Sequence, residues 1–147
     1  METKTRFWKE RLIVTELKQF LQSHPNTAGV EVMMPDNNGI IRGKRIDIHE
    51  AESLFEKGLN FCAATPLLDS GGDVIDGLIL GSDDGDPDIF GHPVDGSLTP
   101  VPWLEKEMAQ VLITLVGRDG NPYPHEARNV LSRVVQKLAD DDLHATI

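Results

Sequence analysis

The sequence predicts an α+β fold, with helices and a mainly antiparallel sheet in one chain of 147 residues. Two observations lead to this prediction. Apolar residues recur at helical spacing near both ends of the chain, whereas the runs between them are short and bounded by turn residues. The expected order is therefore a helix, a β-hairpin, a short helix, several strands and a final helix.

A helix followed by a hairpin is predicted in the first part of the chain. The helix is expected from about Glu10 to Ser23, where apolar residues repeat at helical spacing and His24-Pro25-Asn26 follows as a stop. Two strands, 29–34 and 40–46, flank the turn Asp36-Asn37-Asn38-Gly39, because asparagine and glycine tolerate positive φ. This hairpin is the most strongly indicated local structure.

A short helix and two more strands are predicted next. The helix spans about His49 to Glu56 and is expected to end at Gly58, since glycine commonly follows the last helical turn. Residues 60–66 are apolar and predict a short extended segment, and residues 67–73 have loop composition. Residues 74–80 predict a strand interrupted at its glycine.

The last third of the chain predicts a loop, two strands and a helix. Residues 82–88 are rich in aspartate, glycine and proline and predict an exposed loop. Residues 98–104 predict a short edge strand limited by its prolines, and residues 108–116 a longer strand. The final helix is expected from Glu126 to Asp140, with one apolar face formed by Val130, Leu131, Val134, Val135 and Leu138.

The net charge of −10 is unevenly distributed. Between Gly58 and Glu105 there are nine acidic residues and no lysine or arginine. This pattern argues against binding to the phosphate backbone of nucleic acid. A solvated acidic loop is the favoured interpretation, and a bound cation or cationic substrate is the alternative. No long apolar run predicts a membrane span, and the single cysteine excludes an internal disulfide, so a cytoplasmic protein is expected.

The sequence contains no recognisable self-contained catalytic motif. The five histidines form no zinc-hydrolase pattern, and phosphate-binding glycine loops and a serine nucleophile elbow are also missing. Cys62 lies in an apolar stretch without a nearby cation, which favours a buried structural thiol over a nucleophile. The aspartates of residues 83–88 do not follow the spacing of a calcium loop. We therefore predict no catalytic residue and no metal site in this chain.

Arg42 and Lys44 form a basic pair on the second predicted strand. Alternation along a strand places both side chains on one face. They have two interpretations: contact with a carboxylate or phosphate, or protection of an exposed strand against pairing with other chains. Residue chemistry favours the second.

A series of short motifs resembles the opening of the glutamine synthetase family, from about residue 15 to the end of the chain. The motifs occur in the family's order, and their appearance is nearest to the gamma-glutamylpolyamine synthetase branch. They are Pro25-Asn26-Thr27, Asp36-Asn37-Asn38-Gly39, Arg42-Gly43-Lys44-Arg45-Ile46, Glu56-Lys57-Gly58, Gly85-Asp86-Pro87-Asp88, Gly96-Ser97-Leu98-Thr99-Pro100 and Arg128-Asn129-Val130-Leu131.

The resemblance implies a fold and a division of the chain. It implies a β-grasp (ubiquitin-like) mixed sheet packed on helices over residues 15–115, preceded by a loose segment at 1–14. Residues 116–147 would begin a truncated catalytic domain, and the chain would stop just before the first metal-binding strand. Ala127 departs from the family, which usually has proline at this helix start, so helix entry is expected to be looser.

The resemblance also implies a reaction and its partners. The longer parent enzyme would use ATP and Mg or Mn to phosphorylate the γ-carboxylate of glutamate, and an amine would attack the acyl phosphate. The residues that hold these groups come later in the family, so the 147-residue chain alone is expected to be inactive. The parent would be a homo-oligomeric ring, and Arg42 and Lys44 are candidates for contacts between its subunits.

One loop of this region would border the amine pocket of a neighbouring subunit. By position it falls near Phe61 to Asp73, with Phe61, Cys62, Ala63, Asp69 and Asp73 as candidate residues. Classical members carry Phe-Asp-Gly-Ser-Ser here, and the aspartate helps to bind ammonium. This chain has Phe61-Cys62-Ala63-Ala64-Thr65 instead, which favours a larger amine near Asp69 or Asp73. The alternative is that both aspartates only form turns.

Two competing interpretations remain for the whole chain. It is either the amino-terminal region of a glutamate–amine ligase or a stand-alone β-grasp interaction module without catalysis. A third, an acidic cation-binding domain, predicts a melting temperature that shifts with calcium.

Overall fold

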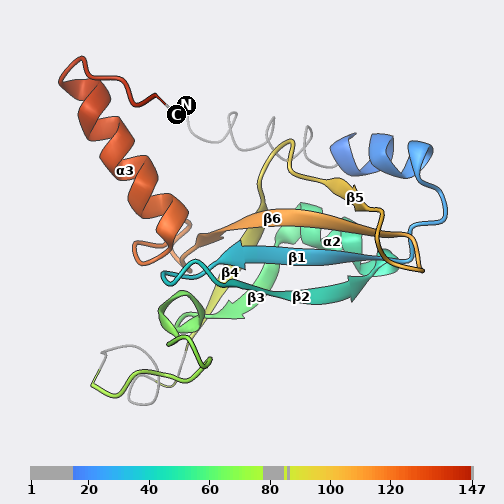
Figure 1. The fold of residues 1–147 in the computed structure, drawn as a ribbon, viewed down its shortest axis with the longest axis horizontal. Helices are drawn as coiled ribbons and strands as arrows, with labels where there is room; N and C mark the ends of the chain where they lie inside the picture. The colour runs from blue at the N-terminus through green and yellow to red at the C-terminus, as the bar shows by residue number, and fades with distance from the viewer. Residues whose placement is uncertain (1–14, 78–84, 86, 147) are drawn as a thin grey trace.

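The computed structural model describes residues 15–77, 85 and 87–146 (Figure 1). Residues 15–23 are helical, so the described part of the first predicted helix is confirmed; the predicted loose segment 1–14 lies outside the described residues. The elements that follow are β1 (Gly29–Pro35), β2 (Ile41–Asp47), α2 (Ile48–Lys57), β3 (Leu59–Cys62), a 3₁₀ turn (Thr65–Leu67), β4 (Asp88–Pro93), β5 (Thr99–Val101), β6 (Met108–Val116) and α3 (Ala127–Asp140).

The strands form one mixed sheet with the order β2-β1-β6-β4-β3, and β5 also pairs with β6. β1 and β6 run parallel, with Val30 beside Ala109, and the other pairs are antiparallel. β6 is therefore the central strand, joined to β1 along one edge and to β5 and β4 along the other (Figure 1). The predicted α+β class with a mixed β-grasp-like sheet is confirmed.

The core lies between one face of the sheet and α2. Alternate residues of β1 and β6 are fully buried on that face, and α2 covers them with Leu54 and Phe55. Because each large apolar side chain stabilises by about 1.5–3 kcal/mol when buried, this two-layer contact supplies most of the driving force for folding. The sheet residues in the core are Val30, Val32, Met34, Val111, Ile113 and Leu115.

α2 begins and ends where its sequence predicts. Asp47 accepts a hydrogen bond from the amide of His49 at 2.9 Å, and Glu50 reaches back to the amide of Asp47, which completes a capping box. At the other end Gly58 has φ +81°, a conformation that side chains rarely adopt. The predicted short helix and its terminal glycine are confirmed.

Four other predicted elements are confirmed, with small changes of boundary. They are the hairpin of β1 and β2, the short edge strand β5, the central strand β6 and the helix α3. β5 is shorter than expected, because only Thr99–Val101 pairs with β6. The extended segment 60–66 is also only partly correct, since β3 ends at Cys62 and Thr65–Leu67 forms a 3₁₀ turn.

Two predictions in the middle of the chain are wrong. Residues 74–77 are not a strand, and the exposed Val74 and Ile75 pair with no other segment of the described chain; residues 78–80 lie outside it. β4 is a strand that the sequence did not predict: its first residue lies in the predicted loop 82–88, and no element was predicted at 89–93. Of that loop, residues 82–84 and 86 lie outside the described residues.

The sheet curls so that its two edge strands approach each other. β2 and β3 lie at opposite ends of the strand order, yet Lys44 Nζ on β2 donates a hydrogen bond of 2.6 Å to the carbonyl of Asn60 on β3. Arg42, Lys44 and Ile46 face the core side, since they lie opposite the buried residues of β1. The cations of β2 therefore point toward the other edge of the sheet.

Gly43, between those two cations, is a point of close approach. A Cβ at Gly43 would lie 1.8 Å from the carbonyl oxygen of Val32 in β1. We expect Gly43→Ala to lower the free energy of unfolding by about 1–3 kcal/mol, because β2 must move away from β1 to make room. Urea unfolding measures the change. Gly39→Ala gives the cost of backbone strain without crowding, because no atom lies within 4 Å of its Cβ position but its φ is +79°. An unchanged urea midpoint for Gly43→Ala would contradict the packing described.

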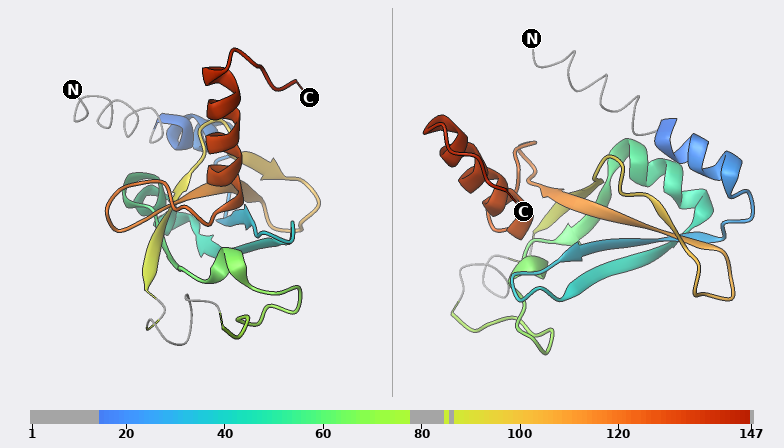
Figure 2. Two further views of the ribbon diagram at one scale, coloured as in Figure 1. Left: turned by 90° about the vertical axis from the view of Figure 1, so that its left-hand side faces the viewer. Right: turned by 45° about the horizontal axis from the view of Figure 1, so that its top comes forward.

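Among the described residues, α3 contacts the sheet through its first turn and then leaves it (Figure 2). Glu126 is completely buried at its N-cap, and accepts hydrogen bonds from the Asn129 amide at 3.1 Å and the Thr114 hydroxyl at 3.2 Å. The predicted apolar face is present but is not packed in this chain: Leu131 is 63% exposed, and Val130, Val134 and Val135 are also exposed.

Candidate functional site

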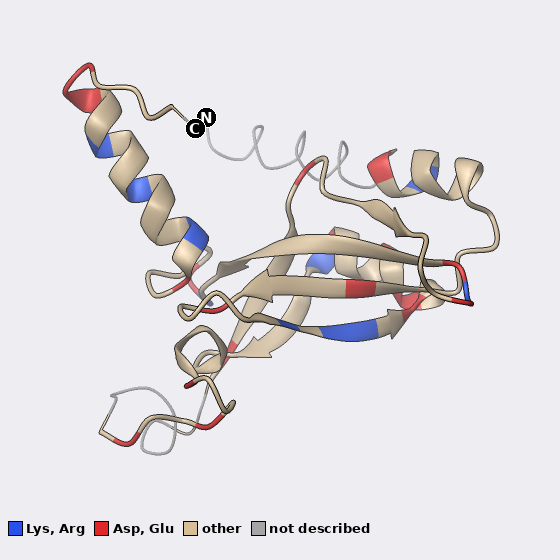
Figure 3. Ribbon diagram, viewed as in Figure 1, with Lys and Arg blue, Asp and Glu red and all other residues tan. Residues whose placement is uncertain are grey.

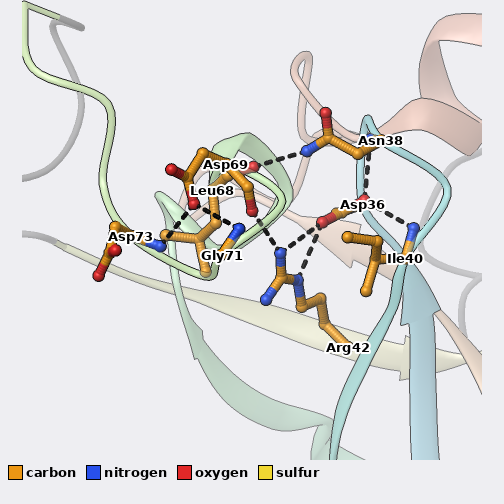
Figure 4. Close-up of polar contacts among 8 residues, drawn as sticks. All are labelled: Asp36, Asn38, Ile40, Arg42, Leu68, Asp69, Gly71 and Asp73. Carbon is orange, nitrogen blue, oxygen red and sulfur yellow. Dashed lines mark hydrogen bonds and ion pairs between the residues drawn. The ribbon is translucent and has the colours of Figure 1, made fainter.

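The structure builds a candidate site where the hairpin turn after β1 meets the segment between β3 and residue 77. The centre is Asp36, which is only 2% exposed. Its Oδ1 accepts hydrogen bonds from the amides of Asn38 and Ile40, both at 2.8 Å (Figure 4). Its Oδ2 accepts one from Arg42 Nε at 2.9 Å. A buried carboxylate with both oxygens satisfied fixes the turn and the direction of the Arg42 side chain.

Arg42 connects this turn to the loop that follows the 3₁₀ turn. Its Nη2 lies 2.9 Å from Asp36 Oδ2 and donates a second hydrogen bond, of 2.7 Å, to the carbonyl of Asp69. Of the two interpretations of Arg42, contact with a carboxylate is therefore observed within the chain. β2 is also an edge strand with inward-pointing cations, and protection of this edge against other chains stays a prediction.

The loop folds around Asp69. Asp69 Oδ1 accepts hydrogen bonds from the amides of Gly71 at 2.8 Å and Asp73 at 2.9 Å, and the Asp69 amide donates to the Asp73 carbonyl at 2.9 Å. Asp69 therefore forms a turn, as the alternative interpretation expected. A Cβ on Gly71 would lie 3.3 Å from Asp69 Oδ1 and 3.7 Å from Asp73 Oδ2, so the two carboxylates flank the same point.

The candidate loop carries only negative charge. Along the described part of the loop after Cys62 the charged residues are all acidic, and the nearest cations are those of β2 (Figure 3). Hydrogen bonds from the amides of Asp73 and then Gly71 lower the pKa of Asp69, against an opposing effect of burial. Burial raises the pKa of Asp36, but hydrogen bonds from Ile40, Arg42 and Asn38 outweigh it and leave this pKa below the ordinary value.

The lowered pKa values of Asp36 and Asp69 predict a loss of stability in acid. Both carboxyls are more acidic in the folded than in the unfolded chain, so the folded chain binds fewer protons. The stabilisation is complete above the ordinary value of 3.8 and is lost as pH falls through the lower folded-state pKa values. We expect the urea midpoint to fall as the pH drops below about 4, and to fall less in Asp36→Asn. Equal pH dependence of the two proteins would contradict this assignment.

The other predicted loop residues lie at the start of the segment and are mostly buried. Phe61 and Ala63 belong to the core, with Lys44 Nζ 4.9 Å from the centre of the Phe61 ring. Cys62 is half-buried, and the Ala63 carbonyl accepts a hydrogen bond from the Tyr123 hydroxyl at 2.9 Å. Phe61 and Ala63 therefore shape the base of the loop, whereas Asp69 and Asp73 lie toward solvent.

Sequence reasoning identified the loop but missed its main anchors. Asp36 and Asn38 were treated only as turn residues, yet Asn38 Nδ2 donates to the Leu68 carbonyl at 2.8 Å. The signal available in the sequence was an aspartate at the start of a turn with an arginine six positions later on the returning strand.

A separate open cavity of about 350 Å³ lies between the 15–23 helix and β5, and contains none of the candidate residues. No group of three or more histidine, cysteine or acidic residues among the described residues is placed to hold a metal ion. None of the described helices is long and apolar enough to cross a membrane.

Comparison of the amino-acid sequence with known proteins identifies relatives of this chain. The chain is 40% identical over 132 residues to gamma-glutamylputrescine synthetase PuuA from Escherichia coli (strain K12), which covers 90% of this chain. It is 30% identical over 129 residues to type-1 glutamine synthetase 2 from Dictyostelium discoideum, which covers 87% of this chain. The chain is homologous to the amino-terminal region of the glutamine synthetase family. No family model matches it.

Solved structures of glutamine synthetase homologues share the fold. A novel glutamine synthase homolog has a TM-score of 0.66 at 22% identity and covers 78% of this chain. A GmaS/ADP complex has a TM-score of 0.65 at 21% identity and covers 86% of it. At these identities the two structures support the β-grasp-like fold alone.

The chain spans only part of its glutamine synthetase relatives. It covers 28% of the length of PuuA and 24% of the Dictyostelium enzyme. A glutamate–isopropylamine ligase from a Pseudomonas species, 30% identical over 129 residues, is covered over 27% of its length. These relatives are ligases that include glutamine synthetases and glutamate–amine ligases, so the homology supports an amino-terminal region of that class.

Proposed function

We propose that this chain is the amino-terminal region of an ATP-dependent glutamate–amine ligase. The observation that carries the proposal is the 40% identity to gamma-glutamylputrescine synthetase over 132 residues, together with the lower identity to a glutamate–isopropylamine ligase. In this role residues 15–115 form the β-grasp domain, and residues 116–147 begin the catalytic domain. The exposed apolar face of α3 supports this division, because such a surface is typical of a region that another part of a protein covers.

Within the ligase, the loop from Phe61 to Asp73 borders the amine pocket of a neighbouring subunit in a ring-shaped homo-oligomer. The loop lies toward solvent beyond Leu68 and carries only acidic charge, which suits a cationic amine. Asp73 is the better candidate for contact with the amine, because Asp69 Oδ1 already accepts two hydrogen bonds within the loop. Cys62 stands where classical members have the aspartate that helps to bind ammonium, and this difference favours an amine larger than ammonium.

The reaction proposed for the longer enzyme forms an amide bond. The γ-carboxylate of glutamate takes a phosphoryl group from ATP, and the amine nitrogen then attacks the acyl carbon and releases phosphate. The described residues do not assemble a metal-ligand set, so we assign them no step that involves ATP, Mg or Mn. Their proposed contribution is to orient the amine and to exclude water from one side of its pocket.

A chimera tests this function. Residues 15–147 replace the matching region of PuuA, and ATP-dependent γ-glutamyl transfer is measured with ammonium, isopropylamine and putrescine. We expect turnover by the chimera, with a larger amine preferred to ammonium, and no turnover by the 147-residue chain alone. Turnover by the chain alone would overturn the proposal. So would a chimera that assembles like PuuA but forms no product with any of the three amines.

A further inference from the structure

The two cations on the core-facing side of β2 both bind the main chain of the loop. Arg42 Nη2 donates to the Asp69 carbonyl at 2.7 Å, and Lys44 Nζ donates to the Asn60 carbonyl at 2.6 Å. These carbonyls lie near opposite ends of the segment 60–73. Arg42 and Lys44, on the same face of β2, therefore hold the segment near both of its ends.

The hairpin turn before β2 adds two more contacts of the same kind. Asn38 Nδ2 donates to the Leu68 carbonyl at 2.8 Å, and the Asn37 amide donates to the Pro66 carbonyl at 3.0 Å. The four donors of the hairpin thus all reach carbonyl oxygens rather than side chains of the loop. Such contacts fix the path of the loop and leave its side-chain chemistry free to vary.

We propose that Arg42 and Lys44 are positioning residues that set amine selectivity by fixing the main-chain path of segment 60–73. This inference rests on the proposed function of the loop. Asp36 holds the guanidinium of Arg42 in place through two contacts of 2.9 Å, so the hairpin turn and the loop move as one unit. Lys44 is held by Asn60 and the Phe61 ring. The main chain that carries Asp73 is thereby held in one position.

The third cation of β2 provides a matched control. Arg45 lies one position further on, faces the opposite side of the sheet and forms an ion pair with Glu31. Its side chain is 62% exposed. A substitution there removes one positive charge from the same strand without removing any of the four contacts to the loop.

Hydrogen exchange on the 147-residue chain tests the positioning role without any assay of activity. Four amides report the state of the loop through their hydrogen bonds: Asp69, Gly71, Gly72 and Asp73. We expect Arg42→Gln to speed their exchange by about tenfold or more, since a hydrogen bond from a charged group is lost. Arg45→Gln is expected to leave them unchanged, and Arg42→Lys to show a smaller effect than Arg42→Gln. Lys44→Gln should speed exchange of the β3 amides instead.

A second variant carries the test if Arg42→Gln does not fold, since that change leaves Asp36 buried without its ion-pair partner. Asn38→Ala removes the bond to Leu68 but keeps the backbone amide that binds Asp36, so the turn should remain folded. It is expected to speed exchange at the same four amides, while amides of β6 stay protected. Unchanged exchange at these amides in a folded Arg42→Gln or Asn38→Ala chain would overturn the inference.

The same variants in the PuuA chimera separate the inference from the function on which it rests. We expect Arg42→Gln to raise KM for the amine by about tenfold, with kcat and KM for glutamate nearly unchanged, and Arg45→Gln to change neither. Faster loop exchange with an unchanged amine KM would mean that the loop does not border the amine pocket, and the proposed function of the loop fails. Unchanged hydrogen exchange of the loop amides in an active chimera would contradict the positioning role and leave the proposed function of the loop intact.

Discussion

Replacing Asp36 with alanine is expected to lower the free energy of unfolding by about 3 kcal/mol, because a buried ion pair is broken and two turn amides lose their acceptor. The carboxylate is almost completely buried and accepts hydrogen bonds from Asn38, Ile40 and Arg42. Arg42 then loses the contact that directs it toward the loop. Urea unfolding of the 147-residue chain measures this change.

Asp119→Ala is the matched control for Asp36→Ala. Asp119 also accepts a hydrogen bond from an amide two positions later, that of Asn121 at 3.0 Å, but it lies in an exposed turn. We expect its replacement to cost about 1 kcal/mol or less. Equal losses in the two variants would show that burial and the ion pair with Arg42 contribute little, and would contradict the central place given to Asp36.

Asn129→Ala is expected to have the other large effect, a loss of about 1–3 kcal/mol, since two buried hydrogen bonds are lost at about 0.5–1.5 kcal/mol each. The carbonyls of Leu115 and Tyr123 each keep one backbone donor, the amides of Tyr123 and Glu126. Asn129 Nδ2 donates to the Leu115 carbonyl at 2.9 Å and to the Tyr123 carbonyl at 3.0 Å. These bonds join the first turn of α3 to the end of β6. The variant should therefore loosen α3 from the sheet as well as lower stability, which circular dichroism and urea unfolding together detect.

Asn121→Ala provides the comparison for Asn129. Its Nδ2 donates only to the exposed Asp119, so its loss is expected to change the free energy of unfolding by about 0.5 kcal/mol or less. A stability of Asn129→Ala similar to that of Asn121→Ala would show that α3 does not depend on the buried contacts at its start.

The elements predicted correctly were those whose local signals agree with their packing. The hairpin has a strong turn at Asp36–Gly39, and β6 has a long, mainly apolar run that the structure places at the centre of the sheet. β4 was missed because Gly91 and Pro93 are normally signs of a strand end. In the structure a Cβ on Gly91 would lie 2.5 Å from Ile113 Cδ1, so glycine is needed there by contact with a neighbouring strand. Such a requirement is not visible in the segment itself.

The contacts that build the candidate loop could not be predicted from the sequence, and its role stays a prediction. Alternation correctly put Arg42 and Lys44 on one face, yet their partners Asp69 and Asn60 come from the far edge of a curled sheet. No local pattern encodes that approach. The strand predicted at 74–80 failed over its described part, 74–77, for the opposite reason, since these residues have no strand partner in the described chain.

Amine selectivity before and after a loop exchange tests the central claim most directly. In the PuuA chimera, segment 61–73 of this chain is exchanged for the corresponding segment of the Dictyostelium type-1 glutamine synthetase 2, with the hairpin 36–45 left unchanged. The ratio of kcat/KM for putrescine to that for ammonium is then compared between the two chimeras. We predict that this ratio changes with the loop by about tenfold or more while kcat changes little. The same ratio in two fully active chimeras would contradict the account.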